Sequence, residues 1–414
     1  MTTNIENSEA KSASATNIHS ENVYLNAQNF SLVLGGPFFQ LLRRARLSDD
    51  ALMLLRQRII ILTLFAWLPL LLLSALEGSA WGGSVAIPFL FDIEVHVRFL
   101  LAMPLLIIAE LVVHKGMRHM VDMFLHRNLI PVNAMQEFNA AITSAFRLRN
   151  SGLAEALLIA LVYGVGILVI WRQFIGLDAL TWYAAPLAEG SKLSFAGMWY
   201  SYVSLPIFQF LLIRWCFRLF IWARFLWQVS RIKLNLIATH PDRVGGLSFL
   251  SNSVYALAVL ATAHGAMIAG QLANRIFFLD ASLPQFKAEI AIIVAFWLCV
   301  VFGPLLAFSA QLSQLKRDGL REYGTLAERY VREFDSKWLR GGAPVDEPFV
   351  GSADIQSLAD LGNSYEVVRS MRLAPITKDA VIYLVAAVLL PIVPLMLTMM
   401  PLEELLKQLF GILF

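Results

Sequence analysis

The sequence predicts an all-α, polytopic bundle of about seven transmembrane helices, with amphipathic helices on its cytoplasmic side. Composition is the first observation behind this prediction. Hydrophobic residues make up 58% of the 414 residues and charged residues only 15%, whereas soluble domains are nearer half apolar and a quarter charged. The mean hydropathy of +0.64 agrees, so lipid is the expected solvent for most of the chain.

Seven apolar runs are the second observation. About 20 helical residues cross the hydrocarbon of a bilayer, and seven runs approach this length. The second is the weakest because it is short and carries Glu110 near its end; if it is only re-entrant, the count falls to six. Proline or glycine interrupts nearly every run, so we expect broken helices, which transporters use at binding sites. The predicted spans lie near residues 59–76, 99–113, 153–171, 198–220, 251–272, 290–312 and 379–400.

The distribution of Lys and Arg is the third observation. Seven spans place alternate connecting segments on opposite sides of the membrane. Of the 33 Lys and Arg residues, 27 then fall on the same side as the N-terminus and 5 on the opposite side, with Arg98 at a boundary. Because cytoplasmic loops are enriched in Lys and Arg, the N-terminus is predicted in the cytoplasm and the C-terminus outside. Arg214, Arg218 and Arg224 interleave with tryptophans, and we expect them to extend toward lipid headgroups.

The remaining segments flank the predicted transmembrane bundle of residues 59–312. Residues 1–30 are polar and rich in Asn and Ser, which predicts a disordered tail. Residues 31–58 are expected to form an interfacial amphipathic segment, and residues 401–414 a short amphipathic tail on the outer surface. Residues 313–378 carry apolar positions at helical spacing, which predicts a cytoplasmic helical hairpin that could dock a protein partner.

Ionisable residues at membrane depth are the first candidates for function. Glu110 and His114 share a helix face with Arg118 because each is four residues from the next. They could relay protons or bind a metal, or form an ion-pair ladder that ends a helix. His264 lies mid-way along the fifth run, where haem ligation, a proton relay and an interhelical hydrogen bond all fit. The hydrogen bond is favoured, because haem normally needs a second histidine at similar depth.

An acidic stretch before the second span is another candidate. Asp92, Glu94 and His96 precede Arg98 on the predicted outer side. In an extended chain these alternate residues point the same way, and their donors could hold a divalent cation. A solvated loop leading into a span is the simpler interpretation.

A turn before the fifth span is the last candidate. It contains His240, Asp242, Arg243, Gly245 and Gly246. Pro-Asp and Gly-Gly pairs are typical of turns. The same glycines beside a helix start could expose backbone N–H groups to an anion, with the arginine assisting.

Several function classes find no support in the sequence. We find no hydrolase, zinc-protease or nucleotide-binding motif, which favours a protein that is not an enzyme and leaves any cofactor unknown. Cys216 and Cys299 lie apart in apolar runs, which argues against a disulfide framework. The basic loops have no nucleic-acid-binding pattern, and attraction to anionic lipid explains them.

Three stretches resemble an uncharacterised family of bacterial multi-pass membrane proteins. They are residues 239–247 (THPDRVGGL), 338–347 (WLRGGAPVDE) and 354–364 (DIQSLADLGNS). The resemblance extends over most of the chain from about residue 40. It implies a bacterial source and the inner membrane, and it implies no activity or ligand.

Three function classes follow from these features. A transporter or channel for a small solute or ion is favoured, because of the broken helices and the ionisable residues Glu110 and His264 in the spans. A non-catalytic membrane scaffold or sensor that docks a partner through its cytoplasmic helices is the alternative. A membrane-embedded redox or metal-binding subunit is the second alternative and rests on the histidines. The oligomeric state is open.

Overall fold

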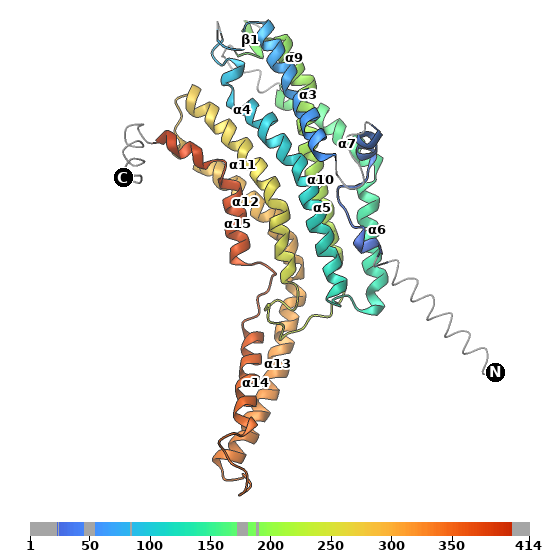
Figure 1. Cartoon of the computed structure of the whole chain (residues 1–414), viewed down its shortest axis with the longest axis vertical. Helices are drawn as coiled ribbons and strands as arrows, with labels where there is room; N and C mark the ends of the chain where they lie inside the picture. The colour runs from blue at the N-terminus through green and yellow to red at the C-terminus, as the bar shows by residue number, and fades with distance from the viewer. Residues whose placement is uncertain are drawn as a thin grey trace, which may run out of the picture.

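The chain folds into a long helical bundle with one short β-ribbon, as the computed structural model shows (Figure 1). The structure describes residues 23, 25–44, 54–82, 85–171, 181–187 and 190–399. Its helices are α2 (Pro37–Arg44), α3 (Leu55–Leu76), α4 (Ile93–His96), α5 (Met103–His126), α6 (Met135–Arg149), α7 (Gly152–Leu161), α9 (Phe195–Trp199), α10 (Leu205–Val229), α11 (Ser253–Phe278), α12 (Lys287–Phe302), α13 (Ser309–Phe334), α14 (Ala353–Arg369) and α15 (Lys378–Leu389).

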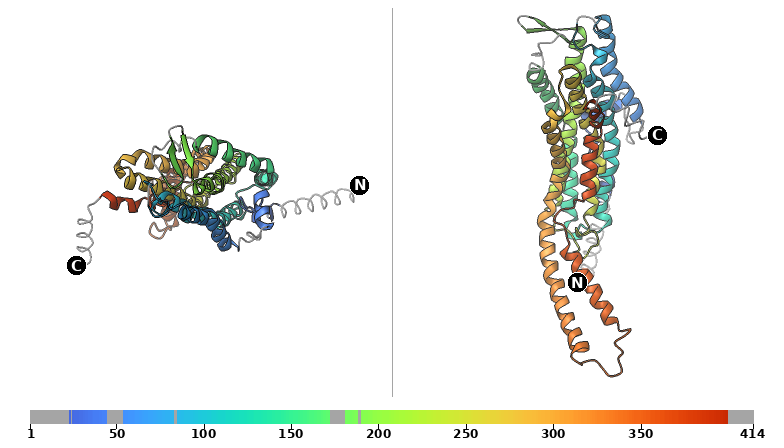
Figure 2. Two further views of the ribbon diagram at one scale, coloured as in Figure 1. Left: turned by 90° about the horizontal axis from the view of Figure 1, so that it is seen from above. Right: turned by 90° about the vertical axis from the view of Figure 1, so that its left-hand side faces the viewer.

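The β-ribbon and the pair of helices α13 and α14 mark the two ends of the bundle. Strands β1 (Ala184–Leu187) and β2 (Gly190–Leu193) pair antiparallel, with Ala184 opposite Leu193. Helices α13 and α14 extend from the opposite end (Figures 1 and 2). We call these the strand end and the hairpin end.

The predicted fold class is confirmed: the chain is a multi-pass integral membrane protein. Among the described residues, five helical stretches are long and apolar enough to cross a bilayer, and two bent helix pairs raise the number to seven if each pair is one span. The five stretches are Leu55–Leu76, Ile93–His126, Phe195–Val229, Ser248–Phe278 and Leu283–Leu339. The bent pairs are Val132–Arg149 with Gly152–Gly166, at 48°, and Lys378–Leu389 with Val393–Met399, at 58°.

The second run, which the sequence identified as the weakest span, is not one of the bent ones. Although expected to be short, it belongs to a stretch of 34 helical residues, whereas one bend lies directly before the third run and the other lies within the seventh. The bend between α6 and α7 has a local cause, because the side chain of Ser151 accepts a hydrogen bond from Ala154 N and starts a new helix. Pro391 lies in the break after α15, where its ring cannot continue a helix.

Prolines within the spans distort the backbone without always breaking it. A π-helical turn (Val97–Ala102) precedes Pro104 at the start of α5, and another (Tyr200–Ser204) precedes Pro206 at the start of α10. Proline removes an N–H group and clashes with the preceding turn, and the wider π turn relieves that clash. Pro69 lies inside a continuous α3.

Helix α11 is the centre of the bundle. It packs against α5 on one side and α15 on the other (Figure 1). In its most apolar window 67% of the residues are buried, compared with 17% in α3 and 22% in the α12–α13 stretch. Gly265 allows the close contact with α15, because a Cβ atom there would lie 2.1 Å from the carbonyl oxygen of Val388.

The outer faces of the peripheral helices are apolar. Exposed large hydrophobic side chains crowd α3, α7 and α12. A surface of this kind is unfavourable in water and suits the hydrocarbon of a bilayer. The exposed set includes Ile60, Ile61, Leu64, Phe65, Leu72, Leu153, Leu157, Ile159, Ile292 and Phe296.

The helical hairpin of α13 and α14 projects beyond the rest of the bundle (Figure 2). Its two arms are joined near the tip by Asp354, which accepts hydrogen bonds from Lys337 Nζ at 2.9 Å and Trp338 Nε1 at 2.8 Å. Hydrogen bonding to Lys337 and Trp338 lowers the pKa of Asp354. This pairing fixes the register of the hairpin.

The predicted disordered tail over residues 1–30 is wrong in its last part. Residues 25–28 are helical, and Val23, Ala27 and Phe30 are buried in the core. The Phe30 ring stacks on Phe146 and lies 5.1 Å from the ring of Phe225. Three apolar residues at helical spacing are enough to seat this segment between α6 and α10, despite its polar composition.

Parts of other predicted segments lie outside the described residues. These are residues 1–22 of the tail, 45–53 of the interfacial segment, and the whole outer tail 401–414. Within the described part, α2 buries Phe39 and exposes Leu41 and Arg43.

Substitution of Gly265 tests the α11–α15 contact. We expect Gly265→Ala to lower the thermal unfolding midpoint of the detergent-solubilised protein, because overpacking costs about 1–3 kcal/mol. Gly362→Ala is the control: Gly362 lies in α14 with no atom within 4 Å of the added methyl group, so the midpoint should stay or rise. Equal midpoints for both variants would show that α11 and α15 are not in contact.

Candidate functional site

Glu110 is the centre of a buried group of charges. It lies in α5 and is 4% exposed. Its carboxylate forms an ion pair with Arg58 of α3, and Arg218 Nη1 of α10 donates to its Oε1 at 2.8 Å. Arg214 Nη1, one turn earlier in α10, lies 3.7 Å from the same oxygen. One carboxylate thus connects three helices.

A second carboxylate extends the group. Glu155 of α7 lies 3.6 Å from Arg214 Nη2, and its Oε2 accepts a hydrogen bond of 2.7 Å from the backbone N–H of Phe38 in α2. The five side chains come from helices α3, α5, α7 and α10, and we call them the arginine–glutamate cluster. They are Arg58, Glu110, Glu155, Arg214 and Arg218.

The cluster carries more positive than negative charge. All five side chains are buried, and three guanidinium groups face two carboxylates. Aromatic faces hold the excess charge in place: Arg218 lies 4.7 Å from the ring of Trp215, and Arg214 lies 4.7 Å from the ring of Phe38. Arg58 Nε is buried with no hydrogen-bond partner among the described residues. A buried guanidinium nitrogen without a partner destabilises the fold, so its presence favours a functional role for the cluster.

The cluster lies near the hairpin-end boundary of the apolar spans. Arg58 is in the first turn of α3, and the rest of that helix is apolar. A small cavity of about 10 Å³ touches Arg149, Arg214, Arg218 and Glu155. This is room for about one water molecule, so the charges are nearly dry in this conformation.

The structure separates the predicted intramembrane residues. Glu110 pairs with arginines of other helices. The His114 Nδ1 atom lies 2.9 Å from the hydroxyl of Ser31, in the N-terminal segment. The His264 Nδ1 atom lies 2.9 Å from the carbonyl of Leu260, one turn back, and its ring packs edge-on against Trp297. His264 therefore makes a hydrogen bond within its own helix.

The predicted cation donors at the strand end also have separate partners. The buried Asp92 accepts hydrogen bonds from Trp182 Nε1 and Asn274 Nδ2, both at 2.8 Å. Glu94 pairs with Arg98, and His96 Nδ1 accepts from Trp67 Nε1 at 3.0 Å. Within the described ranges, no three His, Cys, Asp or Glu side chains are grouped to hold a metal ion. These contacts instead join the α4 loop to α11 and to the β-ribbon.

In the turn before α11, where the sequence suggested an anion site, the carboxylate of Asp242 already binds the backbone N–H groups. Asp242 accepts backbone hydrogen bonds from Val244 at 2.9 Å and from Gly246 and Ser248 at 3.1 Å. Gly245 and Gly246 have positive φ angles, of 66° and 99°, which lets the N–H groups converge. An external anion would compete with this carboxylate.

Other contacts make the same turn a joint between elements. Arg372 N donates to the carbonyl of Arg243 at 2.9 Å, and the Arg372 side chain donates to the carbonyl of Asp242 at 3.0 Å. The His240 Nδ1 atom lies 2.9 Å from the Asp242 carboxylate. The turn therefore joins the start of α11 to the segment between α14 and α15.

The sequence did not identify most of the cluster. We expected Arg214 and Arg218 to extend toward lipid headgroups, and this is wrong because both side chains are buried against Glu110. The signal was present in their spacing of four residues, which places two arginines on one face of an apolar helix. Arg58 and Glu155 gave no such signal, because each is a single charge at the end of its run.

Comparison with known proteins adds no relative: no family model, curated protein or solved structure matches the chain. The likeness of the three motifs to an uncharacterised bacterial family stays a prediction from the sequence. Function is therefore argued from the site.

Loss of the Glu110 charge should destabilise the protein strongly. Glu110→Gln leaves three buried arginines facing one carboxylate, and breaking a buried ion pair from one side costs about 3–5 kcal/mol. We expect a large fall in the thermal midpoint in detergent. Glu289→Gln is the control, because it breaks an exposed pair with Arg275 and should change little. A small effect at Glu110 would mean that this carboxyl group is not ionised in the fold.

Asp242 should make stability depend on pH. Burial raises the pKa of its carboxyl group, but the backbone N–H groups of Val244, Ser248 and Gly246, with the nearby His240, lower it by more, so the pKa lies below its ordinary value of 3.8. A lowered folded-state pKa stabilises the protein above pH 3.8, and this contribution is lost as the pH falls through the folded-state value.

We therefore expect Asp242→Asn to lower the thermal midpoint at neutral pH, and the gap to wild type to narrow below about pH 4. Asp346→Asn, at an exposed position in the hairpin tip, should match wild type at every pH. A gap of constant size across this range would contradict the role given to the Asp242 charge.

Proposed function

We propose that the chain is a transporter or channel for a small anion in the inner membrane of a bacterium. The observation that carries this proposal is the arginine–glutamate cluster, in which three buried arginines face two glutamates between apolar spans. Ionisable residues buried within spans mark pathways for ions and substrates, and arginine or lysine lines pores that select anions.

The excess of arginine sets the sign of the proposed cargo. A small anion in the cluster completes the neutralisation that the two glutamates leave unfinished. It competes with Glu110 for Arg218 and Arg214, so its affinity is limited and it can leave again. A cation would meet three guanidinium groups and two carboxylates that are already paired, and is rejected.

The distorted spans supply the movement that this proposal needs. Three π-helical segments lie toward the strand end, at Val97–Ala102, Val162–Trp171 and Tyr200–Ser204. Two helix pairs are bent by 48° and 58°, and the first of them overlaps the π-helical segment Val162–Trp171. Such interruptions are frequent at functional sites and in the moving helices of transporters. In the conformation described, the cluster is closed to all but about one water molecule.

The proposed orientation places the hairpin end in the cytoplasm. The segments that the sequence assigns to the side of the N-terminus, which include the hairpin, hold 27 of the 33 Lys and Arg residues, and this favours the N-terminus inside and the C-terminus outside. The cluster then lies near the cytoplasmic boundary of the membrane, where a cytoplasmic anion meets it first.

Anion flux into proteoliposomes tests the proposal. Liposomes that contain the wild-type chain should take up chloride, nitrate or phosphate several times faster than empty liposomes. Arg214→Gln should reduce this flux, since Arg214 bridges the two glutamates. Arg275→Gln is the matched control, because Arg275 lies at the strand end, outside the cluster, and forms an exposed pair with Glu289. Flux no greater than that of empty liposomes, for all three anions, would overturn the proposal.

One observation favours a second function, a scaffold that docks a partner through the hairpin. The hairpin tip exposes Leu339, Val345, Phe349 and Val350, and exposed apolar patches mark interaction sites. Val345→Ser with Val350→Ser distinguishes the two functions, because flux should be unchanged if the chain is a transporter. For the redox alternative, the part of the chain that the structure describes offers no group of three His, Cys, Asp or Glu side chains that could hold a metal ion.

A further inference from the structure

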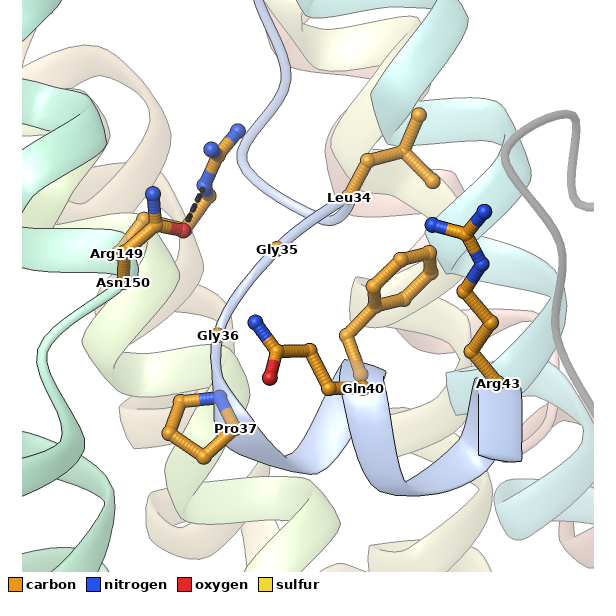
Figure 3. Close-up of a pocket in the computed structure, with 9 residues that line it drawn as sticks. Leu34, Gly35, Gly36, Pro37, Gln40, Arg43, Arg149 and Asn150 are labelled. Atoms are coloured by element: carbon orange, nitrogen blue, oxygen red, sulfur yellow. Dashed lines mark hydrogen bonds between the residues drawn. The ribbon is translucent and has the colours of Figure 1, made fainter. Parts of the chain in front are cut away.

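A pocket opens next to the arginine–glutamate cluster, between the N-terminal segment and the corner where α6 meets α7 (Figure 3). Its volume is about 360 Å³, and the adjoining small cavity shares Gly35 and Arg149 with it. The pocket is lined by Leu34, Gly35, Gly36, Pro37, Phe39, Gln40, Arg43, Arg149 and Asn150.

The polar lining of the pocket suits an anion. Two guanidinium groups, from Arg43 and Arg149, and two side-chain amides, from Gln40 and Asn150, line it, and none of its lining residues is acidic. Guanidinium groups bind phosphate oxygens through charge-assisted hydrogen bonds. The pocket therefore presents donors and positive charge on two sides of an open space.

Arg149 is half-buried and differs from the buried arginines of the cluster. Its Nη1 donates to the carbonyl of Ser31 at 2.7 Å, its Nε donates to Asn150 Oδ1 at 3.0 Å, and its guanidinium lies over the ring of Phe146. No carboxylate of the described residues pairs with it. Arg218, on the same small cavity, adds a charge of the same sign. The guanidinium group of Arg149 is therefore available to an anion in the pocket, and the nearest carboxylate of the arginine–glutamate cluster on the small cavity is Glu155, which pairs with Arg214.

Two glycines shape the pocket wall. Gly35 and Gly36 have φ angles of 139° and 89°, which side chains rarely allow. A Cβ atom at Gly35 would lie 2.4 Å from Asn150 Oδ1 and 2.6 Å from Arg149 Nε. Only glycine lets these two side chains lie against the loop, and this contact holds them at the pocket.

The pocket lies at the level where a span begins. Helix α2 ends at Arg44, and α3 begins at Leu55 with its arginines in the first turn and apolar residues beyond. Lipid phosphates lie at this boundary between hydrocarbon and water.

We infer that this pocket binds a phosphate group. The group belongs either to an anionic lipid or to a free phosphate ion, and both present the same charged oxygens to Arg43 and Arg149. The pocket volume accommodates a phosphate with a small attached polyol. The inference does not depend on anion transport, because a chain that transports nothing still binds phosphate here.

Binding to the detergent-solubilised full chain tests the inference in two arms. The first arm titrates inorganic phosphate against sodium chloride of equal ionic strength by calorimetry. The second arm counts retained phosphatidylglycerol and phosphatidylcholine molecules by native mass spectrometry. Binding in the first arm identifies free phosphate, and selective retention of phosphatidylglycerol alone identifies a lipid headgroup.

Two variants have matched controls. Arg43→Gln should weaken binding about tenfold, whereas Arg44→Gln removes the same charge from the same helix outside the pocket lining and should not. Gln40→Glu places a repelling carboxylate in the pocket by a conservative change at an exposed position. Its control is Gln356→Glu in α14.

The expected result is about tenfold weaker binding in Arg43→Gln, loss of binding in Gln40→Glu, and wild-type binding in both controls. All four proteins should be monodisperse and equal to wild type in their unliganded thermal midpoints. If Arg43→Gln lowers the unliganded thermal midpoint, the comparison of Gln40→Glu with its control Gln356→Glu tests the inference by itself. No binding of either probe, equal loss in Arg44→Gln, or wild-type binding by Gln40→Glu would overturn the inference.

Discussion

The pairing of Glu110 with three arginines is the interaction on which the structure depends. Each arginine would be very costly to bury alone, and one carboxylate offsets this cost for side chains of α3 and α10 together. Glu155 extends the pairing through Arg214 to α7 and, through the Phe38 N–H group, to α2. Helices far apart in the sequence are therefore held at one level of the membrane, and α11 packs against α5 of this assembly.

The N-terminal segment connects the cluster to the pocket. Its residue Phe38 covers Arg214, while Ser31 contacts both His114 and Arg149. The segment closes the cluster on one face and forms one wall of the phosphate pocket on the other. An anion bound in the pocket and an anion bound in the cluster would thus act on the same stretch of chain, with Arg149 between them.

The sequence predicted those features of the fold that depend on residues close together along one helix. Apolar runs and basic loops indicated the spans, and helical spacing indicated the hairpin of α13 and α14. Partners across helices were beyond its reach: spacing connected Glu110 to His114, whereas the structure pairs it with Arg58, Arg214 and Arg218. The seating of Phe30 and the closeness of Gly35 to Asn150 are likewise tertiary contacts. Composition alone predicted a disordered tail over residues 1–30, although Phe30 is buried.

A double-mutant cycle on Glu110 and Arg218 tests the account most directly. The free energies of unfolding of wild type, Glu110→Gln, Arg218→Gln and the double variant give the coupling between the two side chains, with Glu289 and Arg275 as the exposed reference pair. The account predicts a coupling of about 1–3 kcal/mol and a double variant more stable than Glu110→Gln alone. Additive effects, with no coupling beyond that of the reference pair, would contradict it.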